Sequence, residues 1–433
     1  MQKIEDIAVV HGESFYIFHP HVFRRNYERY VVAFREVYQK TQVAYSYKTN
    51  YLPYACRLVE EMGGFAEVVS DMEYMLAKEL RVDPAHIIFN GPVKTIDAVE
   101  DVLIHGGTVN LDAIYECALV EEISCRHRDK ILSVGLRCNF DLDTKSPSRF
   151  GMDVEGSEFP AAINRLGALG NVRLAGLHCH FPMRDSVSYE KRAKKMLALS
   201  RKVFSVPPVF INIGGGFFGE VGAELRAQLG AVVATERDYA HVIGRAFAET
   251  FAAYPESSRP WLIIEPGTAL VANTMQFAAR VVSVKNIRGK SFTTVHGSTY
   301  NTCPTAKGIN LPIAVYRPGI GRITRSSQAP TDICGYTCIE SDVLYRGCDI
   351  EIAEGDFIVF DNVGSYSVVM KPPFILPNVP ILEVNEMGTV ERVLKRRETY
   401  NDVFGTFQHG GCAFERARSR MSSKISSEPK HHV

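Results

Sequence analysis

A repeating pattern between about residues 40 and 270 constrains the fold more than any other feature of this chain. Each repeat has a short apolar, β-branched segment, typical of a buried strand, and then a longer segment with apolar residues three and four positions apart, typical of a helix. The expected strands are residues 43–47, 64–69, 87–90, 108–111, 131–139, 173–181, 209–213 and 261–265. Eight consecutive strand–helix units predict a (β/α)8 barrel, an α/β fold, rather than an open doubly wound sheet.

The pattern changes after residue 270, where short alternating runs are separated by Gly, Pro, Asn and Asp. This change predicts an antiparallel β domain, with strands expected at residues 278–284, 291–295, 313–316, 357–360 and 366–370. An earlier apolar run, residues 14–19, is expected to pair with that domain. The predicted organisation is an N-terminal strand in residues 1–25, a barrel in 26–270, a β domain in 271–412 and a flexible polar tail in 413–433.

The composition argues against several classes of protein. The 49 Lys and Arg residues balance the 49 Asp and Glu residues, which argues against a nucleic-acid partner, because such a partner demands clustered positive charge. No apolar run approaches the roughly 20 residues that a membrane-spanning helix needs, and the first residues do not resemble a signal peptide. The ten cysteines include no C-x2-C pair, so we expect no metal site and a cytoplasmic protein with reduced thiols.

Charged residues, histidines and a glycine triplet gather where the predicted strands end, which is where (β/α)8 barrels carry out their chemistry. They are Lys48, Glu67, Arg137, His178, His180, Gly214, Gly215, Gly216 and Glu265. Most also have a structural interpretation: Lys48 as a solvated residue, His180 as a core histidine, the glycines as a tight turn. Glu265 differs, because a carboxylate at the end of a buried strand is costly unless it meets a cation.

Together these groups meet the requirements of pyridoxal 5′-phosphate. A glycine loop offers backbone N–H groups to a phosphate, and a lysine amine forms a Schiff base with an aldehyde. A buried glutamate keeps a ring nitrogen protonated, a histidine stacks on the ring, and the ring acts as an electron sink.

Seven short segments carry a resemblance to a known family. They are Ala44-Tyr-Ser-Tyr-Lys48, Ala66-Glu-Val-Val-Ser70, Gly176-Leu-His-Cys-His180, Asn212-Ile-Gly-Gly-Gly216, Glu265-Pro-Gly267, Gly335-Tyr-Thr-Cys338 with Asp342, and Asp361-Asn-Val-Gly364-Ser-Tyr366. In this order they resemble the fold-type III, alanine-racemase-like decarboxylases that use pyridoxal phosphate. That group contains diaminopimelate, ornithine and arginine decarboxylases, and the resemblance covers residues 14–374.

The resemblance implies roles for the matching positions. Lys48, His180 and Glu265 would be the Schiff-base lysine, the histidine stacked on the ring and the partner of the ring nitrogen. Further contacts to the ring or its phosphate would come from Glu67, Gly214, Gly215, Gly216 and Tyr366. Cys338 would enter from a partner subunit and return a proton to the α-carbon, so the active unit would be a homodimer with shared sites.

Two departures from the family pattern concern anion binding. Thr268 follows Glu-Pro-Gly where the family normally has arginine, so one contact to a phosphate or carboxylate is missing. Residues 181–185 replace a Gly-Ser pair that normally helps to hold the phosphate. We hypothesise that Arg184 supplies a replacement anion contact, to the cofactor or to the distal end of the substrate. The alternative is an exposed loop pair between Arg184 and Asp185.

A third departure concerns the substrate. Ile339 follows Cys338 where the family usually has an acid that reaches the distal end of the substrate, and residues 313–317 lack the acid of ornithine-type members. A buried ammonium without a counter-charge is expensive. The sequence therefore predicts an amino acid whose distal end is neutral, acylated or anionic, served by Arg184 or Arg317. Glu340 could move into the place of the absent acid and undo this specificity.

The chain thus looks most like the divergent natural-product and siderophore branch, whose substrates are amino acids already joined to another group or to a carrier protein. Three alternatives stay open: a decarboxylase of free diaminopimelate or ornithine, an amino-acid racemase, and a catalytically silent homologue that binds a partner. The cysteine segment around Cys338 favours decarboxylation over racemisation. Retention of Lys48, His180 and Glu265 argues against the silent homologue.

Overall fold

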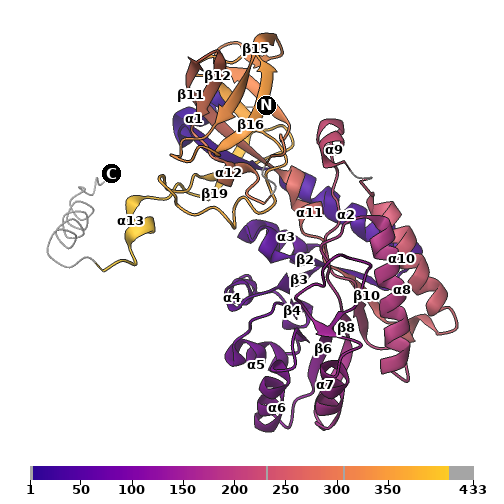
Figure 1. Cartoon of the computed structure of the whole chain (residues 1–433). Helices are drawn as coiled ribbons and strands as arrows, with labels where there is room; N and C mark the ends of the chain where they lie inside the picture. The colour runs from indigo at the N-terminus through magenta and orange to yellow at the C-terminus, as the bar shows by residue number, and fades with distance from the viewer. Residues whose placement is uncertain (1–2, 231–232, 306–307, 409–433) are drawn as a thin grey trace.

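Eight parallel strands close into a barrel, as the strand–helix repeat predicts (Figure 1). The computed structural model describes residues 3–230, 233–305 and 308–408. The strands pair in the order β2-β3-β4-β5-β6-β8-β9-β10, and β10 returns to β2. Their bounds are β2 (Thr41–Ser46), β3 (Phe65–Val68), β4 (Ile87–Phe89), β5 (Thr108–Leu111), β6 (Leu132–Asn139), β8 (Val172–His178), β9 (Phe210–Asn212) and β10 (Trp261–Ile264), with a short β7 (Met152–Asp153) beside β6. Each of the eight expected segments overlaps one strand of the ring.

Five strands of the barrel contribute to a buried cluster that is separate from the main hydrophobic core. The cluster consists of Ala44, Ile88, Ala175, Phe210 and Ile263. A Cβ on Gly176 would lie 2.3 Å from the carbonyl oxygen of Phe210, so only glycine lets β8 approach β9 this closely.

Helices surround the ring of strands (Figure 1). They are α2 (Pro20–Val37), α3 (Pro53–Glu61), α4 (Asp71–Glu79), α5 (Ile96–Ile104), α6 (Glu116–Arg126), α7 (Glu158–Gly167), α8 (Ser186–Val203) and α10 (Glu236–Thr250). The short α9 (Ala223–Leu229) lies nearer the β domain, where Gln228 bonds Asn310. Caps fix where several begin. Asp185 accepts the N–H of Ser188 at 2.7 Å to start α8, and Thr235 with Asp238 forms a capping box at α10.

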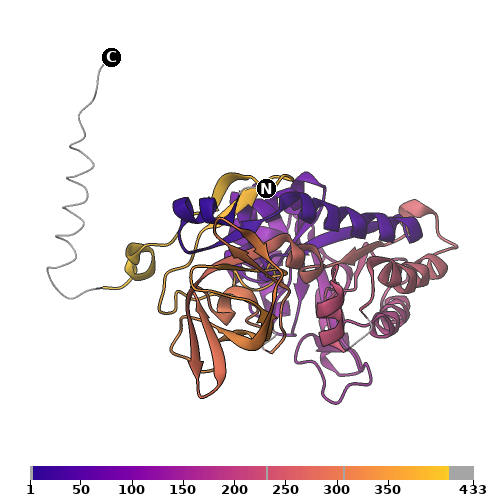
Figure 2. The ribbon, with the colours of Figure 1, turned by 90° about the horizontal axis from the view of Figure 1, so that it is seen from above.

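The N-terminal strand belongs to the β domain, as predicted. β1 (Ser14–Phe18) lies between β11 (Met275–Ile287) and β18 (Ile381–Val384), antiparallel to the first and parallel to the second. The sheet runs β14-β13-β17-β11-β1-β18-β19, and β11 also continues through β12 and β15 to β16. The remaining bounds are β12 (Lys290–Val295), β13 (Ile313–Arg317), β14 (Gly321–Ile323), β15 (Ser326–Cys334), β16 (Val343–Ile350), β17 (Phe357–Phe360), β19 (Val390–Lys395), α1 (Ile4–His11), α12 (Thr299–Thr302) and α13 (Tyr400–Phe404). Figure 2 shows this domain to one side of the barrel.

Two predictions about the β domain need correction. The domain is mixed rather than purely antiparallel, because β1 with β18 and β12 with β15 pair in parallel. Residues 366–370 form a turn and not a strand, since Tyr366 has a φ of +63°, which no strand residue adopts. The expected tail, residues 413–433, lies outside the described residues.

Among the residues that the structure describes, no helix is long and apolar enough to cross a membrane. Within the same ranges, no group of three or more His, Cys, Asp and Glu side chains is arranged to hold a metal ion.

Candidate active site

Lys48 lies just after β2, where the chain turns into the 3-10 helix η1 (Tyr47–Thr49). Its Nζ contacts Oε2 of Glu67 on the neighbouring strand β3 and donates to Oγ of Ser46 at 3.1 Å. Glu67 is only 1% exposed, so its carboxylate needs the cation that Lys48 supplies. Burial by itself would lower the pKa of Lys48, but the carboxylates of Glu67 and Glu265 outweigh burial and raise that pKa above the ordinary lysine value.

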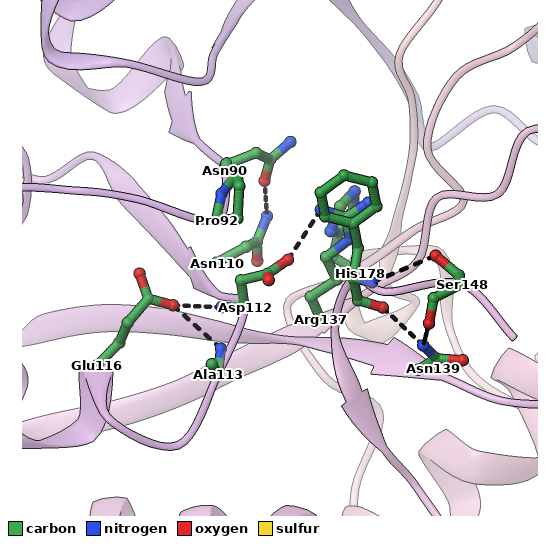
Figure 3. Close-up of polar contacts among 12 residues, drawn as sticks. Asn90, Pro92, Asn110, Asp112, Ala113, Glu116, Arg137, Asn139, Ser148 and His178 are labelled. Atoms are coloured by element: carbon green, nitrogen blue, oxygen red, sulfur yellow. Dashed lines mark hydrogen bonds and ion pairs between the residues drawn. The ribbon is translucent and has the colours of Figure 1, made fainter.

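Asparagines connect the strand ends across the barrel. Nδ2 of Asn90 donates to Oε1 of Glu67 at 3.0 Å and to Oε1 of Glu265 at 2.7 Å. Asn212 donates to the same oxygen of Glu265 at 2.7 Å. Asn110 donates to Oδ1 of Asn90 at 2.8 Å (Figure 3). Neutral donors thus hold both carboxylates in place without cancelling their charges.

Glu265 follows β10 and is 1% exposed. Nε2 of His178 lies 3.4 Å from its Oε2, although neither ring nitrogen of His178 makes a hydrogen bond of good geometry within the described residues. Burial would raise the pKa of Glu265, but His178 and Lys48 outweigh it and lower the pKa well below the usual glutamate value. Glu265 is therefore a buried anion, held at Oε1 by two amide donors and approached at Oε2 by His178.

His180 is held by the glycine loop. Its Nδ1 accepts the N–H of Gly215 at 3.0 Å. Burial lowers the pKa of His180 well below the ordinary histidine value, and the charge of Lys48 lowers it further. A neutral imidazole that accepts at Nδ1 carries its proton on Nε2. His180 therefore has one N–H left to offer.

The loop that follows β9 requires glycine at two successive positions. A Cβ on Gly214 would lie 2.3 Å from the carbonyl oxygen of Cys179, and a Cβ on Gly215 would lie 2.1 Å from that of Glu265. Gly216 has a left-handed φ of +101°. Within the described residues, the backbone N–H groups of Gly216 and Phe217 have no acceptor in the protein, so two adjacent donors are available to an anion.

Replacing Gly215 with alanine is expected to lower the free energy of unfolding by about 3 kcal/mol, because the new Cβ would collide with backbone that cannot move aside without shifting Glu265. Gly222→Ala is the matched control, since nothing lies within 4 Å of its added Cβ and its φ is −61°. Urea unfolding of the two variants measures the difference. Equal midpoints for both would contradict the close contact.

The β domain reaches Lys48 through residues 361–367. The N–H of Tyr366 donates to the carbonyl of Thr49 at 2.8 Å, and Asn50 donates to the carbonyl of Gly364 at 2.8 Å. Gly364 packs so closely that a Cβ would lie 1.9 Å from the carbonyl oxygen of Val271. Tyr366 thus lies beside the turn that carries Lys48.

Arg184 is not part of an exposed ion pair with Asp185. The Asp185 side chain caps α8 instead, and the Arg184 guanidinium lies 5.1 Å from the ring centroid of Phe218, two residues beyond the glycine loop. The Arg184 carbonyl accepts the hydroxyl of Tyr239 at 2.5 Å. The Arg184 guanidinium therefore lies over a residue that follows the glycine loop, and its anion contact stays a hypothesis.

Arg317 is already occupied by carboxylates. Its Nε and Nη2 donate to the two carboxylate oxygens of Asp356, both at 3.0 Å, and its Nη1 donates to Glu351 at 3.1 Å. These ion pairs belong to the β domain, so an anionic substrate would have to compete with two carboxylates for Arg317. Arg317 stays a prediction, and Arg184 is the better candidate for binding an anionic substrate.

Cys338, Ile339 and Glu340 are exposed on the loop between β15 and β16. Within the ranges that the structure describes, no hydrogen bond or ion pair joins these three residues to the barrel of the same chain. The loop is anchored from behind by Thr337, whose hydroxyl donates to Asp342 at 2.6 Å. Within the described residues, no bond thus ties the Cys338 loop to the barrel that carries Lys48.

A cavity of about 680 Å³ opens at the ends of β5 and β6. Figure 3 shows three of its lining residues: Asp112, which accepts from Arg137 at 2.9 Å, and Asn139, which donates to the carbonyl of Ser148 at 2.7 Å. Phe181, the residue after His180, also lines it, so the cavity adjoins the candidate site. Its lining is acidic, with Asp112, Asp141, Asp153, Glu155 and Glu158 against the single cation Arg149.

Glu73 is a third buried carboxylate near Lys48, after Glu67 and Glu265. Its Oε2 accepts the N–H of Val69 at 2.9 Å, and burial raises its pKa to about 7. A raised pKa in the folded state means that the folded protein holds this proton more tightly than the unfolded chain. The resulting stability is present below the ordinary glutamate pKa and is lost as pH rises through about 7.

Glu73→Gln is therefore expected to remove a pH-dependent loss of stability. Between pH 4.5 and 8 the wild type should lose about 3 kcal/mol more than the variant, the free energy that corresponds to its two pKa values. Unfolding by urea across that range measures it. Glu79→Gln, an exposed residue of the same helix, is the control, and parallel pH profiles for wild type and Glu73→Gln would refute the buried titration.

The asparagine network and the contact between His178 and Glu265 were not predicted. Asn90 follows β4, Asn110 lies in β5 and Asn212 ends β9, so all three stand at the barrel rim. The same search for polar residues at strand ends, extended to the third and fourth strands, would have found Asn90 and Asn110. Their hydrogen-bond partners could not be predicted from the sequence, because those partners lie up to 175 positions away.

Pyridoxal phosphate fits these residues on three observations. The backbone donors of Gly216 and Phe217 suit a phosphate. The buried carboxylate of Glu265, whose pKa is lowered, suits a protonated ring nitrogen. The amine of Lys48 stands on the same rim, within the electrostatic influence of Glu265.

Comparison with known proteins agrees with this fit. A family model described as the pyridoxal binding domain of pyridoxal-dependent decarboxylases matches residues 24–272. The chain is 25% identical over 418 residues to the diaminopimelate decarboxylase of Methanocaldococcus jannaschii, and 26% identical over 419 residues to that of Bacillus subtilis, covering 92% of each chain in both comparisons.

Solved structures share the fold. The crystal structure of the M. jannaschii diaminopimelate decarboxylase superposes with a TM-score of 0.80 at 23% identity, covering 94% of both chains. An arginine decarboxylase from Paramecium bursaria Chlorella virus gives a TM-score of 0.72 at 18% identity, covering 88% of this chain and 99% of that one. Because the family model spans more than half of the sequence, the chain belongs to the pyridoxal-dependent decarboxylases, carboxy-lyases whose cofactor is pyridoxal phosphate.

Proposed function

We propose that the protein removes the α-carboxylate of an amino acid as carbon dioxide at the site around Lys48 and Glu265. The observation that carries this proposal is the presence, on one barrel rim, of a lysine amine beside Glu67 and a buried carboxylate held by two asparagines. Bound pyridoxal phosphate supplies a ring that withdraws electrons from the α-carbon as the carboxylate leaves.

In this proposal each residue has its own task. Lys48 binds the cofactor aldehyde covalently, and Glu67 with Ser46 orients its Nζ. Glu265 stays ionised and holds a proton on the ring nitrogen, because its own pKa is lowered. His180 lies against the ring.

The phosphate is held in this proposal by the loop Gly214–Gly216, through the free N–H groups of Gly216 and Phe217. Tyr366 is the second proposed phosphate contact. Its backbone N–H donates to the carbonyl of Thr49, the residue that follows Lys48, and this bond holds Tyr366 in place.

Cys338 returns the proton to the α-carbon and comes from a second copy of the chain, so the proposed active unit is a homodimer. Its exposure and the lack of a described bond between its loop and its own barrel support this assignment. Mixing Lys48→Ala with Cys338→Ala subunits should restore about a quarter of the wild-type rate, because one site of each mixed dimer is intact. If each site used its own Cys338, mixing would restore nothing.

We infer further that the distal end of the substrate is neutral, acylated or anionic, as on an amino acid joined to another group or to a carrier protein. Ile339 stands next to Cys338 and offers no counter-charge, and an ammonium buried there would be unpaired. Arg184 is the better candidate cation for an anionic distal end. This specificity would place the chain in the natural-product and siderophore branch.

Decarboxylation of free diaminopimelate is the second candidate. The relatives named diaminopimelate decarboxylase match over 92% of the chain, and the acidic cavity beside His180 could accept a distal ammonium. Glu340, one residue beyond Ile339, could also reach it.

Carbon dioxide release separates the two candidates. Wild-type protein with pyridoxal phosphate is assayed with diaminopimelate, ornithine, lysine and the side-chain-acylated forms of ornithine and lysine. Faster release from the acylated forms supports the first candidate, and Ile339→Glu should then shift the preference toward the free diamino acids. Faster release from diaminopimelate establishes the second. Racemisation without carbon dioxide would overturn both.

A further inference from the structure

Arg192, on α8, is a buried cation that is 0% exposed. Within the part of the chain that the structure describes, no carboxylate pairs with it, and its buried Nε and Nη1 make no hydrogen bond. Rings of Tyr189 and Phe181 lie 4.2 Å and 5.7 Å from the guanidinium carbon, but such contacts offset only part of the cost of burying a charge.

The guanidinium of Arg192 lies against the glycine loop. Its Nη2 donates to the carbonyl oxygen of Met183, and that oxygen is 3.7 Å from the place that a Cβ on Gly216 would occupy. The adjacent Tyr189 hydroxyl donates to the carbonyl of Gly215 at 2.6 Å. The arginine is therefore separated from the loop by a single backbone carbonyl.

Two anion contacts that the family normally provides for the cofactor or the substrate are missing from this sequence. Thr268 stands where the family has arginine, and Met183 belongs to the segment that replaces the Gly-Ser pair. A dianionic phosphate bound by N–H groups alone would remain without a counter-charge. A buried guanidinium with two free nitrogens would in turn remain without an anion.

We propose that Arg192 neutralises the phosphate of the cofactor at the glycine loop, in place of the arginine absent at position 268. The inference rests on the proposed function, which assigns that loop to the phosphate. It explains why a cation on the inward side of α8 is tolerated with no carboxylate beside it. Arg192 would act on the phosphate and not on the reacting carbon, so it is a binding and positioning residue.

The test compares two forms of the cofactor. Affinities for pyridoxal phosphate and for pyridoxal, which lacks the phosphate, are measured by absorption titration of wild type, Arg192→Met and Arg201→Met. Arg192→Met should lower the affinity for pyridoxal phosphate about 10- to 100-fold, the effect of one hydrogen-bonded charge. The affinity for pyridoxal should not change. Arg201→Met removes an exposed cation from the same helix and should change neither affinity.

A purely structural role gives a different result, because loosening residues 181–184 would lower the affinity for both compounds equally. That outcome, or unchanged affinity for pyridoxal phosphate, would overturn the inference while leaving the proposed function intact. Wild type that binds neither compound through Lys48 would overturn both.

A second measurement covers the case in which Arg192→Met does not fold. Phosphorus NMR of the wild-type holoenzyme should show a phosphate that stays dianionic from pH 5 to 8, and Arg192→Lys, which keeps the charge, should preserve this. A phosphate that titrates near its ordinary pKa of about 6 in the wild type would overturn the inference.

Discussion

Replacing Lys48 with alanine is expected to abolish both the visible absorption band of the bound cofactor and carbon dioxide release. The amine of Lys48 is the covalent attachment point in the proposed function, and no other lysine touches Glu67 among the described residues. The loss in rate should exceed about 10³-fold, since both the attachment and the orientation of the cofactor disappear. Spectra before and after borohydride, together with carbon dioxide assays, measure the two effects.

Lys48→Arg separates the chemistry from the charge. Arginine keeps a cation beside Glu67 and Ser46, so the protein should remain as stable as the wild type while the band and the activity are lost. Lys194→Ala, which removes an exposed lysine, should leave both intact. A Lys48→Ala protein that kept the borohydride-sensitive band would show that another residue carries the cofactor.

Replacing Glu265 with glutamine is expected to lower the turnover number by about 10²- to 10³-fold while the cofactor stays attached to Lys48. Glutamine fits the space and can still accept the hydrogen bonds of Asn90 and Asn212, but it carries no charge to hold a proton on the ring nitrogen. The absorption band should persist, whereas the rate at saturating substrate should fall.

Glu265→Asp tests the same carboxylate differently. It keeps the charge and shortens the side chain, so it should retain more activity than the glutamine variant if the charge matters most. Full activity in Glu265→Gln would refute the role, and loss of the band would show that the residue serves folding or cofactor binding instead.

Local patterns predicted the barrel, whereas most contacts between distant segments could not be predicted. The strand–helix period and the rim residues Lys48, Glu67, His180 and Glu265 follow from rules that act over a few positions. The turn at Tyr366 looks like a strand in sequence, and becomes a turn because residues 361–367 pack against the turn that carries Lys48.

Charged residues show the same limit of prediction from local sequence patterns. Arg317 and Arg192 look alike in sequence, as cations within ordinary elements. Only the fold shows that the first meets Asp356 and Glu351, and that the second is buried with free nitrogens near the glycine loop. A pattern of apolar residues predicts burial for apolar side chains and says nothing about which arginine is buried.

The position of β1 constrains the order in which the chain can assemble during synthesis. Tyr16 pairs with Ile381, so an early strand waits for one that leaves the ribosome 365 residues later. All eight barrel strands, which end at Ile264, are made within that interval. The barrel can therefore form co-translationally, while residues 14–18 expose an unpaired strand edge that a chaperone or a second nascent chain could bind.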